Sequence, residues 1–191
     1  MRKLSLWVVS CALAALVAPC SAQAMPDTEE AQTARLVTVF WGIVGYTRWP
    51  DAGEGPLRLC LVGDDRRSSI IRQSVHRLPE TAAGVALGRT ATVRSLQGED
   101  ASGCDIVYVA GSSQERMSGL SFADAPVLTI GEGETTCSAG GMFCLLLRSN
   151  EEGEEVIDGF AVNLEAISGS ALWVDPQALR LSRRHHQKQE P

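Results

Sequence analysis

The residues in this chain best suited to chemistry are its cysteines, and two of them flank a Gly-Gly pair. The stretch "TTCSAGGMFCLLL" places Cys137 and Cys144 seven positions apart. Structural zinc needs four Cys or His ligands at short spacings, and a thioredoxin-type centre needs C-x-x-C at a helix start. The sequence has neither pattern, and its histidines are His76, His185 and His186. We therefore expect no metal site and no thiol–disulfide enzyme, and interpret Cys137 and Cys144 as a structural bridge closing a Gly-rich turn.

Other catalytic patterns are also missing from the sequence. There is no G-x-S-x-G nucleophile motif, no P-loop and no G-x-G-x-x-G. Gly63 and Gly111 follow predicted strands, at the edge where open α/β sheets bind ligands, but turn glycines are the more economical interpretation. We expect no catalytic residue and no cofactor.

The amino-terminal sequence "MRKLSLWVVSCALAALVAPCSAQA" has the three parts of an export signal. Arg2 and Lys3 supply a positive start, Leu4 to Val17 is an apolar run too short to span a bilayer comfortably, and Ala22-Gln23-Ala24 is a small-x-small cleavage site. We predict that residues 1–24 are a signal peptide cleaved near Ala24. The mature protein is then exported and soluble.

Removal of this leader leaves an even number of cysteines in an oxidising compartment. Cys11 and Cys20 leave with it, and the four that remain are Cys60, Cys104, Cys137 and Cys144. Such a set indicates two disulfides, for which three pairings exist. The short loop favours Cys137 with Cys144, which then pairs Cys60 with Cys104.

The charge of the chain bears on its partners. The formal net charge is −6, and the leader holds basic but no acidic residues, so the mature part is more negative still. An acidic surface disfavours nucleic acid and anionic lipid as partners.

Apolar periodicity predicts helices that alternate with strands. An amphipathic helix runs from Asp27 or Thr28 to about Tyr46, with Gly42 and Gly45 marking close approach to a neighbour. The predicted strands lie within 57–62, 89–96, 104–112 and 125–133, and the predicted helices within 64–78 and 112–120. A hairpin, "MFCLLLR" with "IDGFAVN", and two short helices within 164–171 and 176–184 follow.

This order of elements predicts an α/β fold in a single domain, residues 25–183. A mostly parallel sheet is flanked by helices and carries an antiparallel edge hairpin, and two disulfides brace it. The tail, residues 184–191, is expected to be disordered.

An ordered set of motifs resembles the YfiR family of periplasmic regulators, over nearly the whole mature chain. The motifs are "GIVGYTRWP", "PLRLCLVG", "GCDIVYVAG", "PVLTIGE", "CSAGGMFCLLL" and "FAVNLEAISGSALWVDPQALRLS". Within them, Trp49-Pro50, Gly140-Gly141 and Phe160, Asn163 and Leu164 match the core of the family's pattern. The four mature cysteines stand where the family places its own, and the family's pairing agrees with ours.

The resemblance implies a repressor without enzymatic activity. Members bind the periplasmic part of an inner-membrane diguanylate cyclase and hold it inactive, which lowers cyclic di-GMP and limits exopolysaccharide and biofilm. An OmpA-like outer-membrane lipoprotein can sequester the repressor, and redox damage to the disulfides is another proposed route of release. A homodimer is expected.

The candidate contact residues follow from residue type and position. Arg48 and Trp49 belong to the types enriched at interface hot spots, although Trp49 is also suited to a core plug between helix and strand. Arg48 should reach solvent beside the mouth of the sheet, in the extended segment imposed by Pro50. Ile167, Trp173 and Arg180 form a possible second part of this surface. The alternative function is a receptor for a nucleotide-like or aromatic small molecule, held by Arg48 and the glycines after the strands.

Overall fold

The computed structural model describes residues 28–50, 55–80, 84, 87–111, 113–122 and 125–186. The predicted signal peptide lies outside the described residues. Helix α1 (Glu29–Gly45) begins after Thr28, whose side chain accepts a hydrogen bond from the Ala31 N–H at 3.2 Å, and ends at the cap residue Tyr46. These bounds confirm the predicted amphipathic helix.

Six strands form the main sheet. They are β2 (Leu57–Val62), β3 (Ala91–Ser95), β4 (Ile106–Val109), β5 (Leu128–Glu132), β6 (Phe143–Ser149) and β7 (Glu155–Val162), in the spatial order β3-β2-β4-β5-β6-β7. Neighbouring strands from β3 to β6 pair in parallel, and β7 pairs antiparallel with β6. The mostly parallel sheet with an antiparallel edge hairpin is confirmed.

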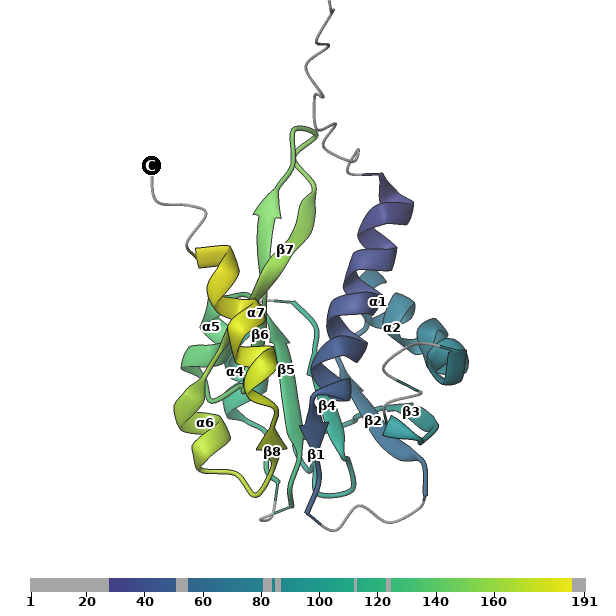
Figure 1. Ribbon diagram of the computed structural model, residues 1–191, viewed down its shortest axis with the longest axis vertical. Helices are drawn as coiled ribbons and strands as arrows, with labels where there is room; N and C mark the ends of the chain where they lie inside the picture. Colours follow the sequence, from purple (N-terminus) through teal and green to yellow (C-terminus); the bar gives the residue numbers. More distant parts are fainter. Residues whose placement is uncertain are drawn as a thin grey trace, which may run out of the picture.

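Helices cover both faces of the sheet (Figure 1). On one face lie α1, α2 (Arg66–Ser74) with the 3-10 turn η1 (Val75–Glu80), and α7 (Pro176–His186). On the other lie α4 (Gln114–Ser118) and α5 (Glu134–Ser138). The parallel strands β4 and β5 are buried at every position, which is why they read as continuous apolar runs.

Aromatic side chains fix α1 on the sheet. The ring of Phe40 packs edge-on against Trp41 at 5.0 Å and against Tyr108 of β4 at 5.8 Å between centroids. The indole N–H of Trp41 donates to the Ser74 hydroxyl at 2.8 Å, so this buried polar group has a partner on α2. Helix α1 is thereby bound to both the sheet and its neighbouring helix.

The structure differs from the sequence-based expectations in several elements. The helix predicted over 64–78 ends at Ser74 and continues as η1. Cys137 lies in the short helix α5 rather than in a turn, because five residues are too few to show a helical period. Helix α7 continues to His186, into the segment predicted as a tail.

The prediction for Gly42 is wrong. A Cβ atom placed at Gly42 would meet nothing within 4 Å, so this glycine does not mark a close helix contact. The face of α1 that carries it looks onto open space.

The two disulfides join the predicted partners. Cys60 of β2 is bonded to Cys104 just before β4, and Cys137 of α5 is bonded to Cys144 of β6. The first bridge ties two neighbouring strands, and the second ties a helix to the strand that follows it.

The lengths of the closed loops predict different contributions to stability. The sequence separations are 44 residues for Cys60–Cys104 and 7 for Cys137–Cys144. Loop-closure entropy then gives about 4 kcal/mol for the longer loop and about 2.4 kcal/mol for the shorter one. We predict these losses in the free energy of unfolding for the double variants Cys60→Ala/Cys104→Ala and Cys137→Ala/Cys144→Ala, measured by urea denaturation. Equal losses, or a larger loss for the short loop, would contradict this order.

Candidate partner-binding surface

A small antiparallel ribbon stands beside the main sheet and carries two of the predicted contact residues. It pairs β1 (Thr47–Arg48) with β8 (Trp173–Val174), so that Arg48 lies opposite Trp173. Thr47 and Val174 point inward and are buried, whereas Arg48 and Trp173 point outward, as strand alternation requires. Trp173 is 54% exposed, an unusual state for a side chain of this size.

The ribbon is held to the helices on either side of it. The Asp175 N–H donates to the Tyr46 carbonyl at 2.9 Å, which joins the cap of α1 to the segment that starts α7. The Asp175 carboxylate in turn accepts from the Gln177 N–H at 2.8 Å, in the first turn of α7. The ribbon is therefore a fixed platform between two helices.

Arg48 is exposed, but part of its guanidinium is engaged. Its Nη1 donates to the Gly45 carbonyl at 2.6 Å and to the Thr47 carbonyl at 2.9 Å. Carbonyls at the end of a helix lack partners within the helix, and a cation there also opposes the negative end of the dipole. Arg48 thus satisfies the end of α1, and no other residue in the described ranges accepts from its remaining N–H groups.

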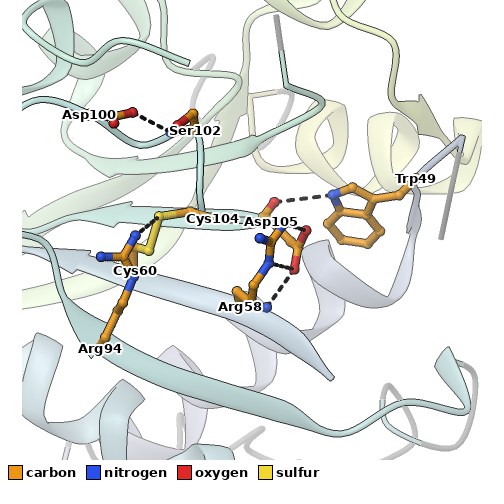
Figure 2. The surroundings of a disulfide bond; sticks show 8 residues. All are labelled: Trp49, Arg58, Cys60, Arg94, Asp100, Ser102, Cys104 and Asp105. Carbon is orange, nitrogen blue, oxygen red and sulfur yellow. Dashed lines mark hydrogen bonds and ion pairs between the residues drawn. A yellow bond between two sulfur atoms is a disulfide. The ribbon is translucent and has the colours of Figure 1, made fainter. Parts of the chain in front are cut away.

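Trp49 is half-buried and anchored rather than free. Figure 2 shows its indole pointing from the end of the ribbon toward Asp105, whose carbonyl accepts the Nε1–H at 3.2 Å. The Asp105 carboxylate also accepts a bidentate pair from Arg58 of β2, at 3.0 Å from Nε and 2.8 Å from Nη2, and a third bond from the Arg58 backbone N–H at 2.7 Å. This cluster joins the ribbon to β2 and β4.

Asp105 follows Cys104 directly, so the cluster adjoins the first disulfide. The Nη2 of Arg94 lies 3.4 Å from the Cys104 sulfur on the other side (Figure 2). Burial acts to raise the pKa of Asp105, but hydrogen bonds from Arg58 outweigh it and lower that pKa below its usual value. The hydrogen bond to Asp105 also raises the pKa of Arg58, against a smaller effect of burial.

The ribbon does not lie at the mouth of the sheet where we expected it. Trp49 contacts Asp105 at the amino end of β4, so the ribbon adjoins the amino ends of the strands. The reason is connectivity, because residues 47–50 come before β2 and its first residue is Leu57. Arg48 therefore cannot act together with Gly63 and Gly111, which follow the carboxyl ends of β2 and β4.

Side chains of the protein itself occupy the edge of the sheet where the parallel strands have their carboxyl ends. Strand order reverses between β2 and β4, which is where open α/β sheets bind ligands. There Nη1 of Arg116 donates to the Ala110 carbonyl at 3.0 Å and lies 2.7 Å from the position of a Cβ on Gly63. The Gly111 N–H donates to the carboxylate of Glu132 at 3.0 Å. A side chain of the protein thus takes the N–H that a ligand anion would use.

Glu132 is the centre of a buried charged network that the sequence did not suggest. Its side chain is fully buried, accepts the Tyr108 hydroxyl, and pairs with Nε of Arg67 on α2 at 3.0 Å. Arg67 reaches on to Glu155 at the start of β7, at 3.0 Å. Burial, reinforced by the Glu132 charge, raises the pKa of Tyr108 well above its usual value, so the phenol stays protonated and can donate.

The remaining predicted contact residues are less closely grouped. Ile167 lies on α6 (Leu164–Ser168), partly buried against the core, and Arg180 is exposed on α7. Within the described part of the chain, no hydrogen bond or ion pair joins Arg180 to the ribbon. Sequence reasoning overlooked Leu164 as a contact candidate, although it is 53% exposed at the start of α6. Its place in an apolar motif gave no sign of exposure.

These features define a disulfide-braced α/β domain with a fixed polar and aromatic ribbon on its surface. A family model described as YfiR/HmsC-like matches residues 34–183. The chain belongs to this family, which is regulatory rather than catalytic and is associated with periplasmic control of diguanylate cyclase signalling. In the ranges that the structure covers, no helix has both the length and the apolar character needed to cross a membrane.

The Asp105 cluster predicts a loss of stability in acid. Because the pKa of Asp105 is lower in the folded state, its contribution to stability is complete above about pH 4 and is lost as pH falls through the folded-state value. We predict that Asp105→Asn lowers the free energy of unfolding by about 2 kcal/mol at neutral pH and reduces its dependence on pH in acid. Urea denaturation from neutral pH to about pH 3 tests this. Parallel pH curves for variant and wild type would contradict it.

The Glu132 network predicts a larger loss in the free energy of unfolding. Glu132→Gln leaves the half-buried charge of Arg67 without its main partner, and should lower the free energy of unfolding by about 3 kcal/mol. Glu151→Gln, on the exposed hairpin tip, makes the same chemical change and should have almost no effect. Thermal and urea denaturation of the two variants measure the difference. Similar stabilities would show that the buried pair is not stabilising.

Proposed function

We propose that this protein is a periplasmic negative regulator that binds the periplasmic part of an inner-membrane diguanylate cyclase and represses cyclic di-GMP synthesis. It would act without catalysing a reaction and would thereby limit exopolysaccharide and biofilm formation. The observation that carries the proposal is the β1–β8 ribbon, which presents Arg48 opposite a largely exposed Trp173 in a chain of this regulatory family.

The chemistry of the ribbon suits a protein partner. Trp and Arg are the residue types that most often dominate binding energy at interfaces. The indole of Trp173 offers a large apolar area, and the exposed guanidinium of Arg48 can bind a carboxylate. Leu164, at the start of α6, is a further exposed apolar side chain.

The rigidity of the ribbon supports the same function. A surface that is already ordered loses less conformational entropy on binding, so more of the contact energy appears as affinity. Trp49 anchors β1 to Asp105 and the Tyr46 carbonyl anchors β8, which keeps the exposed pair in place.

The proposal includes release of the cyclase by a competitor. An OmpA-like outer-membrane lipoprotein would sequester the repressor, and the repressor would act as a homodimer. Export from the cytoplasm is consistent with two disulfides, which persist in oxidising compartments.

Substitution of the two ribbon residues tests the function. We predict that Trp173→Ala weakens binding to the cyclase's periplasmic domain by about 2 kcal/mol or more and Arg48→Ala by about 1 kcal/mol or more, and that both raise cellular cyclic di-GMP. The melting temperature should change little, because Trp173 is exposed and Arg48 satisfies solvent-accessible carbonyls.

Arg77→Ala is the matched control, since Arg77 is exposed on η1 outside this surface. It should bind as wild type does. Unchanged affinity and cyclic di-GMP in both ribbon variants would remove the ribbon from the site, and a large loss of melting temperature would make the residues structural.

A further inference from the structure

A groove runs along one side of α1, separate from the ribbon. It lies between α1, β7 and α7, which Figure 1 shows on the same side of the molecule, and its volume is about 450 Å³. Helix α1 lines it with one continuous stripe at helical spacing: Arg35, Thr38, Val39, Gly42, Ile43 and Tyr46. Phe160 of β7 and Leu181 of α7 close the sides.

Glycine creates the space in this groove. Gly42 stands inside α1, where it destabilises the helix relative to alanine, and a Cβ there would meet nothing within 4 Å. Gly159 of β7 also lines the groove and likewise has no side chain. Close packing therefore does not offset the loss of helix stability caused by Gly42. The missing side chains leave a hollow whose walls are mostly apolar.

The length of the groove suits one extended hydrocarbon chain. The stripe from Arg35 to Tyr46 covers eleven residue steps, or about 16 Å along the helix. The volume also lies in the range of natural ligand sites, which are mostly apolar with few polar groups.

One end of the groove carries a cation. Nη2 of Arg35 donates to the Asp158 carbonyl at 2.9 Å, and the Asp158 carboxylate is 4.0 Å away, a loose ion pair. Among the described residues, the other N–H groups of Arg35 have no partner. The net charge of −6 opposes anions at long range, but salt screens that field, whereas contact with Arg35 acts inside the groove.

We propose that this groove binds a free fatty acid of about twelve carbons, with its chain along α1 and its carboxylate on Arg35. The apolar stripe takes the chain, and the guanidinium, planar and always charged, takes the carboxylate. This site does not depend on the proposed repressor function, since it shares no residue with the ribbon.

Calorimetric titration of the purified protein with laurate, below its micellar concentration, tests the proposal. We expect one saturable site per chain, with affinity rising about two- to fourfold per methylene from octanoate to laurate and then levelling off as the chain exceeds the groove. Dodecanol, which lacks the carboxylate, should bind at least tenfold more weakly.

Two variants and one control variant locate the ligand. Gly42→Leu fills the groove while improving helix propensity, so it should keep or raise the melting temperature and weaken laurate at least tenfold. Ala34→Leu adds the same side chain at an exposed α1 position outside the groove and should bind laurate normally. Arg35→Gln should weaken laurate at least fivefold and leave dodecanol unchanged.

Three outcomes would overturn the proposal. Laurate binding that is unaffected by Gly42→Leu would place the ligand elsewhere. Affinity that keeps rising with chain length, or is equal for laurate and dodecanol, would show non-specific apolar binding. Absence of laurate binding together with a dimer that Gly42→Leu dissociates would assign the groove to a second copy of the chain.

Discussion

The buried carboxylate of Glu132 is the constraint on which the arrangement of this domain depends. A buried charged group must have partners, and those of Glu132 come from two other elements, β4 with the turn after it, and α2. Tyr108 lies on β4, Gly111 follows that strand, and Arg67 belongs to α2. The same guanidinium continues to Glu155 on β7. One charge therefore fixes a helix, two central strands and the turn end of the edge hairpin relative to one another.

A second polar cluster, around Asp105, joins separate elements at the opposite end of the sheet. Asp105 accepts from Arg58 on β2 and from the indole of Trp49, and its neighbour Cys104 is bonded to Cys60. The packing of Phe40 against Tyr108 and the Cys60–Cys104 disulfide brace the same strands. Such a body can present a surface in a fixed geometry, which is what a stoichiometric regulator requires.

Helix α1 connects the features that matter for function. Its buried face packs Phe40 and Trp41 into the core, its carboxyl end is capped by Arg48, and its glycine-bearing side forms the apolar groove. Tyr46 belongs to two of these features, because it lines the groove and its carbonyl holds the ribbon. Tyr46 directly precedes β1, so the groove and the ribbon that carries Arg48 and Trp173 are adjacent along the chain.

The sequence by itself determined the class of fold and most of its elements. The period-3.6 pattern located α1, and short apolar runs located the central parallel strands, because α1 buries one face and β4 and β5 are buried at every position. The disulfide pairing also followed from the sequence, since a loop of seven residues left one partner for each remaining cysteine. Weaker local signals failed for α5, which is too short to show a period, and for the early end of α2.

Only the tertiary structure decided which side chains are exposed and which residues from distant elements are neighbours. The pairing of Arg48 with Trp173 joins residues 125 positions apart through two strands of two residues each, and such strands carry no pattern. Chain order did place Arg48 before β2, so the amino end of the sheet was the correct location, and the expectation of the opposite mouth overlooked this. The Glu132 network and the hollow over Gly42 depend on distances between elements. A glycine in a helix reads the same in sequence whether a neighbour touches it or nothing does, and a glutamate that ends a strand reads the same whether it meets water or a buried arginine.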